Sequence, residues 1–144
     1  MKVIRKATLA DVDKMEQIVG QAGLQTEGIV DNVDNFLIME DKDGVLTAVV
    51  GFEFQNSSGL LRSLVLTKQS DQFFILELMK AAFEFSKKQG VETLYLCTQQ
   101  QSSVDFFKFI GFEKVEETHV EDLNEFEHYK NIVDENPVIM KCSF

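Results

Sequence analysis

Two polar residues, Arg62 and Ser63, interrupt the otherwise apolar stretch LLRSLVL. An arginine in this setting can bind a carboxylate through two parallel N–H···O bonds, so Arg62 would suit a carboxylate-bearing substrate. Arg62 could equally face solvent or pair with an acid on a neighbouring strand. Glu53, on the preceding stretch, is either a general base or that acidic partner. Thr98, at the end of a later apolar stretch, is a candidate for lining the same site.

The elements that must position these residues are a strand, a polar turn and a long helix between Gly59 and Gly90. We expect the strand at 60–66, the turn at 67–72 and the helix at 73–89, with Gly90 ending the helix. Unpaired N–H groups and the helix dipole make such a helix start a good anion site. This unit is therefore predicted to be the functional centre. Its turn has no glycine, although glycine lets backbone N–H groups approach a phosphate closely.

The predicted helix is apolar nearly all round, which indicates burial on more than one side. A strand at 93–97 follows it. Because this strand is reached through a helix, we expect it to lie parallel to the strand at 60–66, with a right-handed crossover. Two such strands with diverging carboxyl ends leave a crevice, which is the usual ligand position in α/β sheets.

The other predicted elements follow from hydrophobic spacing and from turn residues. Before the strand–turn–helix unit, we expect a strand at 3–6 and a helix that is entered at Thr8 and Asp11 and ended by Gly20 and Gly23. A loop at 25–35 follows, which would close over a substrate. Hairpin strands are then expected at 36–39 and 45–54, and Gly51 suggests a bulge in the second of them. After the strand–turn–helix unit, the predicted elements are a helix capped by Ser102 and ended by Gly111, a strand at 112–115 and a last strand at 138–144. The phenylalanines at 73, 74, 83, 85, 106, 107 and 109 are predicted to be core residues.

Composition limits the class of protein. A chain of 144 residues with 44% hydrophobic content fits one domain, 1–144. The net charge of −10 argues against nucleic acid and anionic membranes as partners. No apolar run approaches the roughly 18 residues of a membrane span, and the N-terminus lacks an apolar leader, so a cytoplasmic location is expected.

The two cysteines and two histidines of the chain do not show the spacing of a metal site. Cys97 is expected in the core, and the histidines in structural or surface roles.

Three segments resemble the GNAT N-acetyltransferases. They are the opening IRKATLADVDKMEQIV (4–19), the hairpin FLIMEDKDGVLTAVVGFE (36–53) and the closing FFKFIGFEKV (106–115), which is similar to the family signature F-[FY]-x-x-x-G-F. The order of predicted strands and helices is also that of the family. The resemblance implies an α/β (α+β) GNAT acyl-CoA N-acyltransferase fold, a mixed sheet of about seven strands flanked by about four helices.

A subgroup is suggested by GLLRSLVL (59–66), ETLYLCT (92–98) and YKNIVDENPVIM (129–140). These segments resemble small amino-acid and arsenic-operon acetyltransferases, whose ending reads F-x-x-L-C-P-x-S-A-V-x-M. In this chain the Cys-Pro is Val133-Asp134 and the Ser-Ala is Asn136-Pro137. The resemblance implies an amino-acid-like acceptor for Arg62 and acetyl-CoA as the acyl donor, with no metal.

The resemblance also assigns roles around acetyl-CoA. Backbone N–H groups of Leu64, Val65 and Leu66 would meet the acetyl carbonyl and the pantetheine arm. The turn that follows would surround the pyrophosphate, and Phe107 would occupy the position of a tyrosine that protonates the thiolate. The turn residues concerned are Lys68, Ser70, Asp71, Gln72 and Phe73.

The chain departs from the family at this turn, because Asp71, Phe73 and Ile75 stand where small residues are usual. A carboxylate about 4 Å from a phosphate would cost about 4 kcal/mol at an effective dielectric constant near 20. That cost could lower affinity by up to about three orders of magnitude. Alternatively, Asp71 points away and caps the helix, while Lys68 and Ser70 supply a partial substitute. Phe107 cannot protonate a thiolate, although many GNAT enzymes do without this group.

The sequence is therefore compatible with two functions. The first is an acetyl-CoA-dependent N-acetyltransferase in which a small amine attacks the thioester directly. The second is a catalytically degenerate GNAT-fold binding or regulatory protein that no longer binds acetyl-CoA. A homodimer formed through the C-terminal strand is compatible with both.

Overall fold

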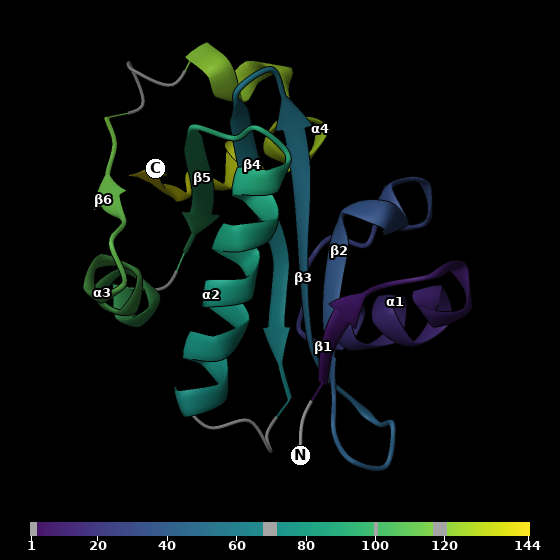
Figure 1. The fold of residues 1–144 in the computed structure, drawn as a ribbon. Helices are drawn as coiled ribbons and strands as arrows, with labels where there is room; N and C mark the ends of the chain where they lie inside the picture. Colours follow the sequence, from purple (N-terminus) through teal and green to yellow (C-terminus); the bar gives the residue numbers. More distant parts are fainter. Residues whose placement is uncertain (1–2, 68–71, 100, 117–120) are drawn as a thin grey trace. The chain divides into compact units, whose positions relative to one another are not determined.

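The computed structural model describes residues 3–67, 72–99, 101–116 and 121–144, without the side chains of 72, 73, 101, 121 and 122. In these residues seven strands form one mixed sheet in the order β1-β2-β3-β4-β5-β7-β6 (Figure 1). The strands are β1 Val3–Lys6, β2 Phe36–Glu40, β3 Leu46–Gln55, β4 Ser58–Leu66, β5 Thr93–Thr98, β6 Glu113–Lys114 and β7 Val138–Ser143. The α-helices are α1 Val12–Gln21, α2 Gln72–Lys88, α3 Gln101–Phe109 and α4 Glu127–Ile132. The predicted fold class is confirmed.

The chain divides into two compact units, residues 1–52 with 63–85, and residues 53–62 with 86–144. We call them unit 1 and unit 2. Two of the boundaries fall inside the strands β3 and β4 and the third falls inside the helix α2, so neither unit is a continuous segment. The prediction that 1–144 is a single domain remains a prediction.

Unit 1 is built around α1 and the antiparallel ladder of β1, β2 and β3 (Figure 1). The buried face of α1 carries Val12, Met15 and Val19, at the spacing of one helix side. These side chains share a core with residues of β2, β3 and β4. Gly23 ends the helix in the left-handed region at φ 77°, with the Leu24 N–H donating to the carbonyl of Val19 at 3.2 Å. Gly20, which was expected to end it, lies inside α1.

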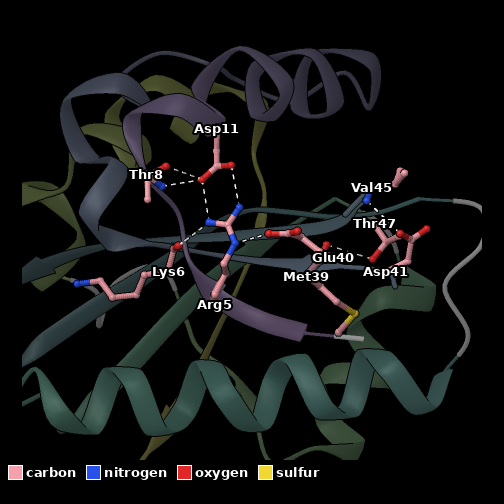
Figure 2. Close-up of polar contacts among 9 residues, drawn as sticks. All are labelled: Arg5, Lys6, Thr8, Asp11, Met39, Glu40, Asp41, Val45 and Thr47. Carbon is pink, nitrogen blue, oxygen red and sulfur yellow. Dashed lines mark hydrogen bonds and ion pairs between the residues drawn. The ribbon is translucent and has the colours of Figure 1, made fainter. Parts of the chain in front are cut away.

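The predicted helix entry at Thr8 and Asp11 is confirmed, and Arg5 joins it to the sheet. The Arg5 guanidinium donates to both carboxylate oxygens of Asp11 at 3.0 Å and, through Nε, to Glu40 (Figure 2). Asp11 Oδ2 also accepts from the Thr8 N–H at 2.7 Å. The hydrogen bonds from Arg5, helped by those from Thr8, lower the Asp11 pKa to about 2. One arginine thus connects β1, β2 and the start of the first helix.

Gly51 does not form the bulge that the sequence suggested. It pairs in register with Phe36, and the irregularity between β2 and β3 falls between Met39 and Glu40. The ring of Phe36 covers Gly51 so closely that a Cβ added there would lie 2.3 Å from Phe36 Cε2. Glycine is required at this position to leave room for the ring.

Unit 2 contains the parallel pair that was predicted. Ser58, Gly59 and Leu60 of β4 pair with 93–95 of β5. β5 then pairs antiparallel with β7 along its whole length. A buried cluster around Leu60 and Tyr95 is covered by residues of α4 and of the short 3-10 helix before it. The helix α4 was not predicted from the sequence.

Two expectations about α3 were wrong. The helix begins at Gln101, so Ser102 lies within its first turn and does not cap it. Phe109, its last residue, is 80% exposed and is not part of the core. Phe107 does belong to the core, with its ring 5.5 Å from that of Phe106 and 5.7 Å from that of Phe112.

In the part of the chain that the structure describes, no helix is long and apolar enough to span a membrane.

Candidate functional site

Ser63 is the most unusual backbone position of β4. Its φ is 58°, although it is not glycine, lies within a strand and is buried. Left-handed backbone costs such a residue about 1 to 2 kcal/mol, so the surrounding packing must impose it. Strained non-glycine residues of this kind cluster at functional sites. Leu64, Val65 and Leu66 follow it; Val65 is buried and the two leucines are half-buried.

Arg62, the residue before Ser63, is a buried charge in unit 2. Its Nη1 lies 3.6 Å from Oε2 of Glu53, and their side chains are only 3% and 12% exposed. The alternative in which Arg62 faces solvent is therefore excluded, and the partner role expected of Glu53 is observed. A buried ion pair stabilises a protein only when its geometry is good and further hydrogen bonds satisfy the remaining donors and acceptors of both groups.

Glu53 has a second contact that the sequence did not suggest. Its Oε2 accepts the backbone N–H of His128 at 3.0 Å, 75 residues along the chain. One carboxylate oxygen therefore receives the N–H of α4 and faces the Arg62 guanidinium. An oxygen with these two neighbours is less available to take a proton from a substrate, so the position favours an anchoring role over that of a general base.

His128 is the residue at this site that sequence reasoning missed. Its side chain is half-buried, its Nδ1 is fully buried, and this atom has no hydrogen-bond partner among the described residues. Burial, and then the charge of Arg62, lower the imidazole pKa to about 4. The ring is therefore neutral at pH 7. No local pattern marks it, because its neighbours at the site come from β3 and β4.

Two other residues named from the sequence, Thr98 and Cys97, lie at the end of β5 in unit 2. Thr98 is half-buried and opposes Val138 in the ladder between β5 and β7. Cys97 packs against the cluster around Leu60, and burial raises its thiol pKa to about 12, so it is protonated at neutral pH. The structure leaves the roles of Thr98 and Phe107 as predictions.

Much of the predicted pyrophosphate site lies outside the described residues. This holds for Lys68, Ser70 and Asp71, and for the side chains of Gln72 and Phe73. Among the described residues, no group of three or more His, Cys, Asp or Glu side chains could hold a metal ion.

Comparison with known proteins places the chain in a family. No protein-family model matches it. It is 32% identical over 140 residues to the uncharacterized protein YwlB of Bacillus subtilis, covering 96% of this chain and 95% of YwlB. The chain belongs to the YwlB family. Because both proteins are covered almost completely, the family relationship extends over the whole chain.

Solved structures show which fold this chain has. An N-acetylglutamate synthase from Neisseria gonorrhoeae, complexed with coenzyme A and N-acetyl-glutamate, superposes with a TM-score of 0.82 at 17% identity. The match covers 99% of this chain but 35% of the synthase. An acetyltransferase of the GNAT family from Staphylococcus aureus matches with a TM-score of 0.79 at 12% identity over 99% of both chains. The fold is therefore the GNAT acyl-CoA N-acyltransferase fold.

Proposed function

We propose that this protein is an acetyl-CoA-dependent N-acetyltransferase for a small amine that carries a carboxylate, such as an amino acid or an analogue. The observation that carries the proposal is the pair of adjacent residues in β4, the buried Arg62 and the strained Ser63. A GNAT fold alone would not specify a substrate. The similar synthase, bound to coenzyme A and N-acetyl-glutamate, supports both the donor and the acceptor class.

Acetyl-CoA would supply a thioester whose carbonyl carbon is attacked by the amine, forming an amide and releasing the thiolate. The N–H groups of Leu64, Val65 and Leu66 are the proposed donors to the acetyl carbonyl and the pantetheine arm, and the left-handed turn at Ser63 supports this because it redirects the strand just before them. Lys68, Ser70, Asp71 and the start of α2 would hold the pyrophosphate.

Arg62 would bind the acceptor carboxylate. Glu53 fixes the guanidinium. In this proposal the proton lost by the attacking amine passes to solvent water, and the released thiolate takes a proton from solvent. Phe107 offers no proton to the thiolate. A coenzyme A thiolate is a tolerable leaving group, so transfer can proceed without that acid. Cys97 belongs to a residue type that can protonate a thiolate. Burial raises its thiol pKa, so the thiol is protonated at neutral pH.

A second candidate is a GNAT-fold binding or regulatory protein that has lost acetyl-CoA. The specific observation in its favour is the glycine-free turn at 67–72, followed by Phe73 and Ile75 in the first turn of α2. Bulky residues there would hinder the approach of a phosphate to the backbone.

Calorimetric titration with acetyl-CoA separates the two candidates. The native protein is compared with a variant carrying Phe73→Gly and Ile75→Gly, after thermal denaturation has established that the variant folds. Micromolar binding by the native protein, with acetylation of at least one member of an amino-acid panel, is expected. Binding gained only by the variant would overturn the enzymatic proposal and support the degenerate one.

A further inference from the structure

The strands β6 and β7 of unit 2 separate soon after they pair. Among the described residues, the last backbone hydrogen bond between them runs from the Val115 N–H to the Ile139 carbonyl, at 2.9 Å. Hydrogen-bonded positions recur every second residue along an antiparallel ladder, so the next one on β7 would be Pro137. Proline has no N–H to donate, and the pairing therefore cannot continue there.

A cavity of about 240 Å³ lies where the two strands separate. Its lining residues all belong to unit 2 and are Lys114, Val115, Glu116, Pro137, Val138 and Ile139. One wall is fixed by Asn136, which holds a left-handed backbone at φ 58° and donates its N–H to the carbonyl of Val133 at 3.1 Å. The volume is slightly below the roughly 300 Å³ at which ligand pockets usually begin, so the cavity suits a ligand of only a few heavy atoms.

The floor of this cavity is apolar and its rim is charged. Val115, Pro137 and Val138 are half-buried and Ile139 is buried, whereas Lys114 and Glu116 are exposed. Neither charged side chain takes part in an ion pair within the described ranges. The cavity thus presents one cationic and one anionic group that the described part of the chain does not neutralise.

The two opposite charges select the kind of ligand. A simple anion would be attracted by Lys114 but repelled by Glu116, and a simple cation would meet the reverse. A small zwitterion can place its carboxylate at Lys114 and its ammonium group at Glu116. A short apolar group on the same molecule would gain from contact with the valines of the floor.

We propose that the cavity between the ends of β6 and β7 is a binding site for a small zwitterion of the amino-acid class. Lys114 binds its carboxylate and Glu116 binds its ammonium group. The site is independent of the buried Arg62 pair, and the inference does not require the protein to be an acetyltransferase. Its occupant has the chemistry both of the proposed acceptor and of an amino acid that is bound without being acetylated.

Nuclear magnetic resonance of protein with ¹³C-labelled valine and isoleucine methyl groups tests the site. L-alanine, propionate and ethylammonium are titrated separately, because they are similar in size but carry both charges, only the carboxylate or only the ammonium group. We expect L-alanine, or another member of the amino-acid panel, to shift the methyl signals of Val115, Val138 and Ile139. The Kd should be about 1 mM, since both ionic contacts are exposed, and the two singly charged probes should bind at least about 5-fold more weakly.

Substitutions on the rim separate ligand binding from a structural effect. Lys114→Met and Glu116→Gln should each weaken binding by about 5-fold. Exchange of the charges, with Lys114→Glu and Glu116→Lys in one variant, should keep the Kd within a few-fold of wild type, because the zwitterion can bind in the reverse orientation. Glu113→Gln is the matched control, since Glu113 does not line the cavity and faces Lys141 at 3.9 Å. It should leave the Kd unchanged.

The outcomes also identify the occupant. A rise in the KM of an acetylated amino acid that parallels its Kd in Lys114→Met and Glu116→Gln supports the site and shows that it holds the acceptor. Loss of the methyl shifts with an unchanged KM supports the site and shows that it holds a separate amino acid. Methyl shifts without any acetylation support the site and count only against the enzymatic proposal. The inference is overturned if no amino acid of the panel shifts these methyl groups, or if propionate or ethylammonium binds as tightly as L-alanine.

Discussion

Glu53 Oε2 accepts the backbone N–H of His128 at 3.0 Å, so a strand residue holds the start of a helix 75 positions later. The same oxygen faces the buried guanidinium of Arg62 at 3.6 Å. The candidate acceptor site therefore depends on one carboxylate that links β3, β4 and α4. This relationship makes the stability of unit 2 and the geometry of the site sensitive to the same residue.

Replacing Glu53 by Gln should destabilise the protein by roughly 3 kcal/mol, because Arg62 would stay buried without its counter-charge. Urea denaturation measures the effect. Glu127→Gln is the matched control, since its ion pair with Lys130 is exposed and should contribute less than about 0.5 kcal/mol. A double variant with Glu53→Gln and Arg62→Met should recover most of the loss. Equal effects of Glu53→Gln and Glu127→Gln would contradict the importance of the buried pair.

Gly51→Ala should destabilise unit 1 by about 1–3 kcal/mol, because the new methyl group would overlap the Phe36 ring. Gly20→Ala is the opposite case. Gly20 lies in α1, and its added Cβ would meet its nearest neighbour at 3.7 Å, so we expect a gain of about 0.5–1 kcal/mol. Thermal and chemical denaturation of both variants gives the comparison. A neutral Gly51→Ala would show that the ring can move aside.

Asp11 should make stability depend on acid pH. Its carboxyl pKa falls from an ordinary value of 3.8 to about 2 in the folded protein, chiefly through the hydrogen bonds from Arg5. Between these values the unfolded chain binds more protons, so the stabilisation is complete above about pH 4 and is lost as the pH falls to about 2. Arg5 is 37% exposed, which limits the contribution to about 1 kcal/mol. Asp11→Asn should therefore be less stable than wild type at pH 7 and equal to it near pH 2; a difference that persists at pH 2 would contradict this assignment.

The left-handed backbone at Ser63 predicts an unusual order of substitutions. Ser63→Gly should be neutral or stabilising by up to about 1 kcal/mol, because glycine adopts this conformation without strain. Ser63→Val should destabilise, since a β-branched residue fits positive φ poorly. Denaturation establishes the stability order, and acetyl-CoA titration should follow it, with binding kept by Ser63→Gly and lost by Ser63→Val. Greater stability of Ser63→Val than of Ser63→Gly would be inconsistent with this backbone.

Local sequence patterns were sufficient for most of the framework. Hydrophobic spacing, glycine positions and the polar turns predicted the strands, α1, α2 and the parallel pairing of β4 with β5, because these signals act between residues close in the chain. The entry of α1 at Thr8 and Asp11 was predictable for the same reason. Gly51 was misread as a bulge because the cause of that glycine, the ring of Phe36, lies on another strand.

Tertiary structure alone decided the composition of the candidate site. The sequence offered Arg62 and Glu53 as possible partners, but their burial and pairing arise from packing across two strands. His128 gave no signal, since α4 is short and its relation to Glu53 spans 75 residues. Likewise, the strain at Ser63 arises from its surroundings, as nothing in the residue type favours positive φ. Local propensity determines where strands and helices form, whereas burial and long-range contacts determine which of their polar groups meet.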